Sequence, residues 1–432
     1  MIAASYLFYS AAGAIFCLLL AGITLGNQAS AKLLARHDDD DRARKRIVVA
    51  AVAFNLLTLG VFKYYGFFAT EVNDALDKAG LGLPVPLASI ALPVGISFIT
   101  FQAISYTVDV YRREIAPAKT IDVALYLSFF PQLVAGPIVR AREFMPQLEA
   151  PRDPRKVAVG AGVALIIIGV VKKVAIADSL AREIVDPVFA VPQAFAAPDL
   201  WLATYAYAVQ IFCDFSGYTD IAIGVALLMG FVFPQNFDRP YRAASFGEFW
   251  RRWHMTLSRF LRDFLYIPLG GNRKGRWKTV RNLLITMVLG GLWHGAAWGF
   301  VLWGTIHGTA LVVEHQFRGK IRLPRWLGWL IVFHIVVLAW IPFRAPDLDL
   351  ASSFFSRLFE PGPATLWTVP VVLVTFAVIA LQLLPARPLD VLRVRFERLH
   401  PAALGVSMAC VIVLVAATVS NQGVPPFIYF QF

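Results

Sequence analysis

The sequence predicts an all-α protein that crosses a membrane many times. Of its residues, 58% are hydrophobic and only 16% are charged, and the mean hydropathy is +0.63. A typical soluble domain carries about 25% charged residues. Hydrophobic runs also recur along the whole chain, and several reach the ~20 residues that a helix needs to cross a bilayer.

The runs define the predicted elements in chain order. They cover residues 3–25, 47–68, 86–108, 120–139, 157–177, 200–232, 282–317, 326–343, 366–385 and 401–421. No basic segment precedes the first run and no clear cleavage site follows it, so we expect a retained helix rather than a signal peptide. Cysteines 17, 213 and 410 all fall in hydrophobic runs. Their odd number and wide spacing predict core packing rather than a disulfide framework or a metal site.

The positive charges predict the orientation in the membrane. The net charge is +12, and lysine and arginine collect in short loops around residues 36–46, 112–113, 140–156 and 239–281. Because cytoplasmic loops are rich in these residues, we attribute the charge to membrane topology and not to nucleic-acid binding. The first helix then runs inward, and residues 421–432 lie outside. Consistent alternation predicts a re-entrant segment at 120–139 and two short helices or a bent hairpin at 282–317.

Segment 245–265 differs from the spans and predicts one amphipathic helix in the membrane interface. Phe249, Trp253 and Leu257 recur at helical spacing on its apolar face, and Ser245 with Glu248 predicts a capping box at its start. The arginines on its other side could anchor the helix on anionic lipid or bind a phosphorylated donor. His254 is expected to be an interface residue rather than a base.

The candidate chemistry lies in a glycine-rich apolar stretch that contains His294 and His307. Ionisable side chains at membrane depth are candidates for functional sites. On one unbroken helix, thirteen residues would place the two rings about 220° apart. They converge only if the chain bends, for which Gly295, Gly299 and Gly304 offer the places.

A buried neutral imidazole could act as general base toward a hydroxyl that attacks an acyl thioester. Two other interpretations stay open. Each histidine could hydrogen-bond to a neighbouring helix, or the pair could relay protons in a transporter, although the sequence has no inverted repeat of the kind many transporters show.

Other candidates give weaker signals. Asp214, Tyr218 and Asp220 lie in the apolar run 200–232 and could line a tunnel or orient a histidine, or form an ordinary interhelical hydrogen bond. Trp293 and Trp303 could form the wall of a tunnel beside an acyl chain, with core packing as the alternative.

Four stretches together resemble the membrane-bound O-acyltransferase family. They are LPVGISFITFQAISYTVDVYR at 92–112, FFPQLVAGPIVR at 129–140, the segment from CDFSGYTD to IPLGGNRKG at 213–275, and RNLLITMVLGGLWHGAAWGFVLWGTIHG at 281–308. The resemblance is strongest to the bacterial branch that includes the membrane subunit of alginate O-acetylation. Members of that branch usually carry a further hydrophobic helix before the stretch that corresponds to residues 4–9.

The resemblance implies a fold and an activity. The fold would be a ring of about 10–12 tilted, partly broken and re-entrant helices around a tunnel, in a single membrane domain over 1–432. Its catalytic core would span about 86–320, and helices from 326–432 would complete it. Acyl-CoA, commonly acetyl-CoA, would enter from the cytoplasm, with no bound cofactor or metal. The acyl group would pass across the inner membrane to an acceptor such as a periplasmic acetyltransferase of the SGNH hydrolase type, which modifies an exported polysaccharide.

The resemblance also implies residue roles. The histidine of the W-H-G stretch, His294, would be the catalytic base, and His307 a second base or an orienting partner. The donor phosphates would lie near basic residues of the 239–281 segment, namely Arg239, Arg242, Arg251, Arg252 and Arg259. Transfer of D-alanyl groups from a carrier protein to teichoic acid, by the same fold, stays open as an alternative.

Overall fold

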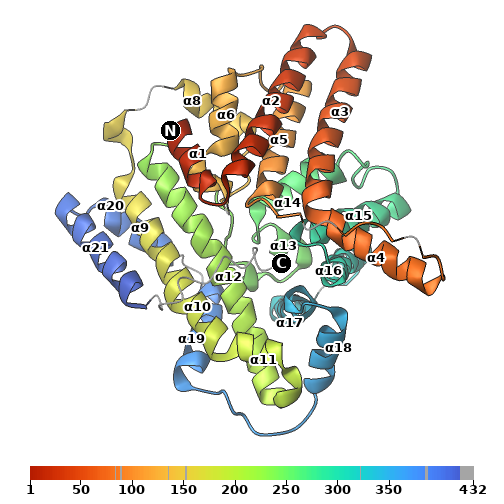
Figure 1. Ribbon diagram of the computed structural model, residues 1–432. Coiled ribbons are helices and arrows are strands. Elements are labelled where there is room, and N and C mark those ends of the chain that lie inside the picture. The colour runs from red at the N-terminus through yellow and green to blue at the C-terminus, as the bar shows by residue number, and fades with distance from the viewer. Residues whose placement is uncertain are drawn as a thin grey trace. The chain divides into compact units, whose positions relative to one another are not determined.

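The computed structural model describes residues 1–82, 84–87, 90–134, 136–150, 153–321, 323–384 and 388–418, and every regular element within them is a helix (Figure 1). Five of these helical segments are long and apolar enough to cross a membrane: Ala14–Arg36, Asp41–Lys78, Val159–Ala190, Ala197–Leu228 and Arg325–Arg344. The predicted class, an all-α multi-pass membrane protein, is therefore confirmed. Residues 421–432, which we expect on the outer side of the membrane, are not among the described residues.

The described chain forms two compact units, Met1–Lys156 and Val157–Phe432. The first contains α1 (Ile2–Ser10), α2 (Ala14–Arg36), α3 (Asp41–Leu59), α4 (Tyr65–Lys78), α5 (Ile96–Tyr111), α6 (Thr120–Ser128), α7 (Phe130–Leu133) and α8 (Ala141–Glu149). A π-helical turn, Gly60–Tyr64, joins α3 to α4. The first hydrophobic run is divided between α1 and α2 at Gly13, whose φ of 140° suits glycine.

Buried polar side chains hold α2, α3 and α5 together in the first unit. The amides of Asn27 and Asn55 exchange hydrogen bonds of 3.1 and 2.8 Å, and Thr107 Oγ1 donates to Asn27 Oδ1 at 2.8 Å. Tyr106 donates to Gln28 Oε1 at 2.7 Å. Run 120–139 is broken at Phe129 between α6 and α7, as short helices in a re-entrant segment would be. Its path relative to a bilayer stays a prediction.

The second unit is built around α12 (Ala197–Leu228), which packs along α9 (Val159–Val170). Glycines allow the backbones of the two helical segments to touch at two positions along their length. A Cβ on Gly169 would lie 2.5 Å from the carbonyl oxygen of Gly217, and one on Gly224 would lie 2.6 Å from that of Gly162. In lipid there is no hydrophobic force that drives helices together, so close van der Waals packing of this kind stabilises the pair.

The remaining elements of the second unit follow in order. They are η3 (Val171–Ala177), α10 (Asp178–Leu180), η4 (Ala181–Val185), α11 (Asp186–Ala190), η5 (Pro192–Ala194), η6 (Pro240–Arg242), α13 (Phe246–Trp250), α14 (Met255–Leu261), η7 (Arg262–Tyr266), α15 (Arg276–His294), α16 (Trp298–Phe317), α17 (Arg325–Arg344), α18 (Leu348–Arg357), α19 (Val369–Leu383), α20 (Pro388–Glu397) and α21 (Pro401–Thr418). Of the three cysteines, Cys213 is buried, Cys17 is partly buried and Cys410 is exposed, so the packing prediction is wrong for Cys410.

The prediction of one helix over 245–265 is wrong. The chain forms α13, reverses through His254 in the left-handed region (φ 41°), and continues as α14 and a π-helical turn. Trp253 and Leu257 are each 1% exposed, because these short helices pack into the protein. The predicted start is confirmed: Ser245 Oγ accepts the Glu248 N–H at 3.1 Å. Glu248 itself reaches back to the N–H of Ala244, at 3.0 Å, one residue before the capping-box position.

Candidate active site

A tight antiparallel hairpin, α15 and α16, carries both predicted histidines. α15 ends at His294 and α16 begins at Trp298, so the hairpin prediction for 282–317 is confirmed and the bend falls at Gly295. The two helices touch through glycine. A Cβ on Gly291 would lie 2.2 Å from the carbonyl oxygen of Phe300, and one on Gly304 would lie 2.4 Å from that of Met287. Gly304 therefore serves close packing and not a bend.

Gly299 has a similar packing role. It lies in the first turn of α16, where a Cβ would meet the carbonyl oxygen of Pro342 in α17 at 2.3 Å. The first turn of α16 thus packs directly against the backbone of α17. Neither α15 nor α16 is among the five segments long and apolar enough to span on their own.

His294 and His307 converge on one indole ring, that of Trp303. The ring centroid of His294 lies 5.1 Å from that of Trp303, and the centroid of His307 lies 4.7 Å from it. His294 is 4% exposed and His307 is fully buried. The expectation that a bend brings them together is confirmed.

Aromatic side chains enclose each histidine. Phe343 of α17 meets the edge of His294 at 5.3 Å. Phe249 stacks on His307 at 5.8 Å, and Trp250 approaches it edge-on at 5.2 Å. Neither ring nitrogen of His307 has a hydrogen-bond partner within the described part of the chain, so the interpretation of His307 as a histidine satisfied by a neighbouring helix is wrong for the groups described.

A third histidine, His254, belongs to the same aromatic cluster. The expectation that it lies at an interface is wrong: its side chain is fully buried. Its ring meets Phe215 of α12 at 4.7 Å and Trp293 at 5.9 Å, and Trp293 in turn lies 5.2 Å from His294. The reversal of the chain at 254 turns this side chain inward, which a continuous helix would not do.

The hydrogen bonds of Asn236 fix the tautomer of His254. Asn236 Oδ1 accepts from the N–H of Thr256 at 3.2 Å and from its hydroxyl at 2.9 Å, which identifies that atom as the acceptor of the amide. His254 Nδ1 lies 3.2 Å from the same oxygen and therefore donates to it. In a neutral ring Nε2 then carries a lone pair, and this buried atom has no hydrogen-bond partner among the described residues. His254 thus presents a proton acceptor inside the cluster.

The acidic candidates lie on α12 and are paired with lysines. Lys173 Nζ lies 2.6 Å from Asp214 and 2.7 Å from Asp178, and all three side chains are at most 7% exposed. Lys172 pairs with Asp220 at 2.6 Å, and Lys173 also lies 5.6 Å from the ring centre of Tyr218. The aspartates thus brace α12 against η3, on the helix that also presents Phe215 to His254. Their predicted role in lining a tunnel stays a prediction.

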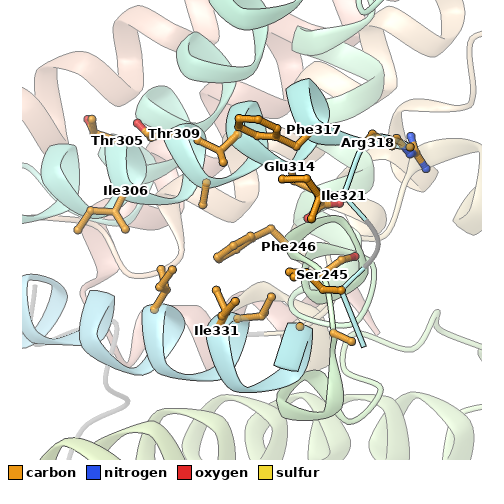
Figure 2. Close-up of a pocket in the computed structure, with 18 residues that line it drawn as sticks. Ser245, Phe246, Thr305, Ile306, Thr309, Glu314, Phe317, Arg318, Ile321 and Ile331 are labelled. Atoms are coloured by element: carbon orange, nitrogen blue, oxygen red, sulfur yellow. The ribbon is translucent and has the colours of Figure 1, made fainter. Parts of the chain in front are cut away.

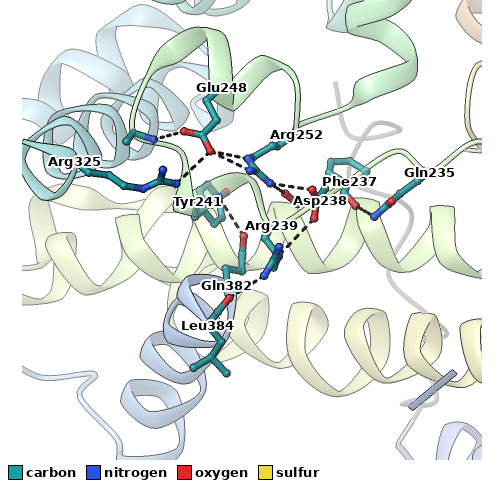
Figure 3. Close-up of polar contacts among 11 residues, drawn as sticks. Gln235, Phe237, Asp238, Arg239, Tyr241, Glu248, Arg252, Arg325, Gln382 and Leu384 are labelled. Carbon is teal, nitrogen blue, oxygen red and sulfur yellow. Dashed lines mark hydrogen bonds and ion pairs between the residues drawn. The ribbon is translucent and has the colours of Figure 1, made fainter. Parts of the chain in front are cut away.

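Two of the predicted phosphate-binding arginines, Arg239 and Arg252, lie in one polar network with Arg325 (Figure 3), and the charges of all three act on Arg242. Arg252 pairs with Asp238 at 2.9 Å and with Glu248 at 3.0 Å. Arg239 donates to the carbonyl of Leu384 at 2.8 Å and lies 3.4 Å from Asp238. Of the others, Arg251 is exposed and Arg259 is half-buried in α14.

Arg242 lies close enough to three other arginines for their charges to act on it. Its pKa lies below the ordinary value because of partial burial and because Arg239, Arg252 and Arg325 repel its charge. Partial burial favours a higher pKa for Glu248, yet the Ala244 N–H and Arg252 hold the pKa of that carboxyl below its usual range. Glu248 is therefore ionised at neutral pH. Four guanidinium groups then surround two carboxylates, and the excess positive charge suits an anion.

The comparisons with known proteins assign the chain to a family. Residues 1–341 match the model of the membrane-bound O-acyltransferase family. The chain belongs to this family. The probable alginate O-acetylase of Pseudomonas aeruginosa is 42% identical over 366 residues, which cover 84% of this chain and 69% of that protein. The peptidoglycan O-acetyltransferase of Helicobacter pylori is 37% identical over 386 residues, covering 81% and 71% respectively.

A further relative has a different activity. The teichoic acid D-alanyltransferase of Streptococcus thermophilus is 30% identical over 289 residues, which cover 60% of this chain and 69% of that protein. Membership makes this multi-pass membrane protein an O-acyltransferase and disfavours the transporter interpretation. Such an enzyme uses an acyl donor. The hairpin supplies two buried histidines, and α13 and α17 supply aromatic side chains that pack against them.

Replacing Lys173 with methionine is expected to destabilise the protein strongly. The change leaves Asp178 and Asp214 buried without their shared ammonium group, a loss that typically costs about 3–5 kcal/mol. Thermal unfolding of the purified variant in detergent measures it. Lys172→Met is the matched control and should cost less, because Asp220 is 19% exposed. Equal melting temperatures for Lys173→Met and wild type would contradict the structural role of the pair.

Proposed function

We propose that this enzyme transfers an acetyl group from cytoplasmic acetyl-CoA, through a tunnel in the inner membrane, to an extracytoplasmic acceptor that O-acetylates an exported polysaccharide. The observation that carries the proposal is the convergence of His294, His254 and His307 on the indoles of Trp293 and Trp303 in a family of O-acyltransferases. The relatives that act on alginate and on peptidoglycan support acetyl as the acyl group and a glycan as the final acceptor.

In the proposed reaction His294 is the general base. A hydroxyl oxygen attacks the carbonyl carbon of the thioester, the new ester bond forms and the carbon–sulfur bond breaks. His294 accepts the hydroxyl proton and returns it to the departing thiolate, so atoms and charge balance. General base catalysis of this kind contributes about 10²–10⁴-fold to the rate, and the rest comes from holding thioester and hydroxyl in line.

The other two histidines support this step. His307 acts as a second base or as an orienting partner across Trp303, from which its ring lies 4.7 Å away. His254 adds the lone pair of Nε2, held in position by its hydrogen bond to Asn236. The indoles of Trp293 and Trp303 form an apolar wall beside the acyl chain and exclude water from the reacting atoms.

The proposed donor site is the arginine cluster on the cytoplasmic side. The diphosphate and 3′-phosphate of CoA match its excess positive charge, and guanidinium groups bind phosphate oxygens in pairs. Arg242 is the central contact, because the carboxylates of Asp238 and Glu248 pair with Arg239 and Arg252. Arg251 and Arg259 extend the basic surface along α13 and α14.

The acceptor in the proposal is a periplasmic acetyltransferase of the SGNH hydrolase type, which passes the acetyl group to the polysaccharide. D-alanyl transfer to teichoic acid is the second candidate, and the lower identity to that relative, 30% against 42% and 37%, disfavours it. Detection of alanine rather than acetate as the ester released from exported glycans would reverse this order.

Arg242→Ala tests the donor site. We expect KM for acetyl-CoA to rise about tenfold with little change in kcat, because one charge-assisted contact to phosphate is lost. Steady-state release of CoA by the enzyme in nanodiscs measures both constants. Arg182→Ala, at an exposed arginine of η4, is the control. Acetyl-pantetheine, which has no phosphate, should react equally with wild type and variant; an equal KM for acetyl-CoA in both proteins would remove Arg242 from the donor site.

A further inference from the structure

A groove outside the histidine cluster runs between α16 and α17 (Figure 2). Its volume is about 810 Å³, within the range of ligand-binding pockets. One wall is a stripe of α16 at helical spacing, including Ile306, Ala310 and Val313, and the other is a stripe of α17, including Ile331 and Ile335. Phe246 lies between the two walls. The groove is therefore apolar along most of its length.

The groove opens to the outside of the protein. Thr309, Val313 and Ile331 are exposed although they line it. In a multi-pass membrane protein such a flank of two helices contacts lipid. From Thr305 to Phe317 the wall extends over roughly 18 Å at 1.5 Å per residue, which is close to half of the ~30 Å hydrocarbon core. One acyl chain of a single leaflet fits that length.

One end of the groove is basic and amphipathic. Arg318 lies at this end in Figure 2, opposite the end occupied by Thr305 and Ile306. The exposed loop between the helices continues with Lys320, and α17 begins at Arg325, whose side chain is 69% exposed. Exposed apolar side chains accompany these cations: Phe317, Ile321, Leu323 and Trp326. Basic residues mixed with apolar ones are typical of the boundary between lipid tails and headgroups.

Two acidic residues near this end offset only part of its positive charge. Glu248 pairs with Arg325 at 3.6 Å, and Glu314 lines the groove. Glu314 directs both carboxylate oxygens toward the N–H of Gly247, at 3.1 and 3.4 Å. The guanidinium of Arg318 and the ammonium of Lys320 are exposed beyond it. The groove thus combines an apolar trough one leaflet deep with a cationic mouth.

We propose that the α16–α17 groove binds an anionic phospholipid of the surrounding membrane, with one acyl chain along the trough and the headgroup phosphate at Arg318 and Lys320. Charge complementarity selects the headgroup, and the apolar stripes accept the chain whatever the headgroup is. The lipid would brace the outer faces of α16 and α17, the helices that carry His307 and Phe343.

The test uses the full-length enzyme, stripped of lipid in detergent and then offered phosphatidylglycerol or phosphatidylcholine with identical chains. Native mass spectrometry counts the bound lipid. We expect wild type to retain phosphatidylglycerol at least tenfold better than phosphatidylcholine, since charge-assisted contacts to the phosphate-bearing anionic headgroup add to the burial of the chain. Arg318→Gln with Lys320→Gln should keep one lipid and lose the preference. Arg182→Gln should keep both.

Filling the trough tests the position of the chain. Ala310→Trp and, independently, Val313→Trp at the rim should each reduce lipid retention at least tenfold. Leu373→Trp, at a 63% exposed position of α19, adds similar bulk outside the groove and should leave retention unchanged. Equal retention of the two lipids by wild type, or full retention by both folded tryptophan variants, would overturn the proposal.

Discussion

His294→Ala is expected to lower the rate of acyl transfer at least 100-fold while leaving the fold intact. The reason is the loss of the proton acceptor at the reacting hydroxyl, and general base catalysis is typically worth about 10²–10⁴-fold. The ring is buried among aromatic side chains and contacts Trp303 and Phe343. Its removal leaves a small cavity among these rings. Release of CoA by the enzyme in nanodiscs measures the rate, and the melting temperature reports the fold.

Two comparisons sharpen this result. His37→Ala, at an exposed histidine after α2, should keep the wild-type rate. His254→Ala and His307→Ala should each reduce the rate less than His294→Ala, because the proposal gives them supporting roles. A wild-type rate in folded His294→Ala would show that another group takes the proton, and a larger loss in His254→Ala would transfer the role of base to that residue.

Gly291→Ala is expected to have the largest effect among changes that do not touch a polar group of the site. Its Cβ would lie 2.2 Å from the carbonyl oxygen of Phe300, so α15 and α16 must move apart. Overpacking costs about 1–3 kcal/mol and sometimes more. Because His294 lies one turn further along α15, the displacement should also lower activity about 100-fold, as a shift of about 1 Å can.

The matched control is Gly22→Ala in the interior of α2. No atom lies within 4 Å of a Cβ added there, and alanine favours a helix by about 1 kcal/mol relative to glycine. Gly22→Ala should therefore keep or raise the melting temperature, whereas Gly291→Ala should lower both the melting temperature and the rate of CoA release. Equal behaviour of the two variants would show that backbone contact in the hairpin does not position His294.

Much of the fold could be predicted from local sequence. Hydrophobic runs of membrane-spanning length identify the helices, because lipid demands that each segment satisfy its own backbone groups. The charge of the loops required the 282–317 run to reverse, and Gly295 marks the bend that the structure shows. Two histidines in a glycine-rich apolar stretch could be recognised as the candidate site, because burying an ionisable side chain in lipid costs free energy.

The features that were missed depend on contacts between distant segments. A continuous helix over 245–265 predicted His254 to be an interface residue. Only the break in the helix, where His254 has a φ of 41°, turns it inward against Asn236. The lysines that pair with Asp214 and Asp220 lie 41 and 48 residues earlier in the chain, in a π-helical turn. No local pattern reports such partners. The one local signal for His254 as a site residue was its position directly after Trp253, between the basic pair Arg251–Arg252 and Arg259.

The most direct test of the proposed function follows the acetyl group across the membrane. Inside-out vesicles that contain the enzyme, its periplasmic partner and the exported glycan receive acetyl-CoA labelled in the acetyl group on the outside. We expect labelled, alkali-labile ester on glycan in the lumen with wild type, and at most a hundredth of that amount with His294→Ala. Labelled ester at the wild-type level with folded His294→Ala, or none from folded wild type in the complete system, would contradict it.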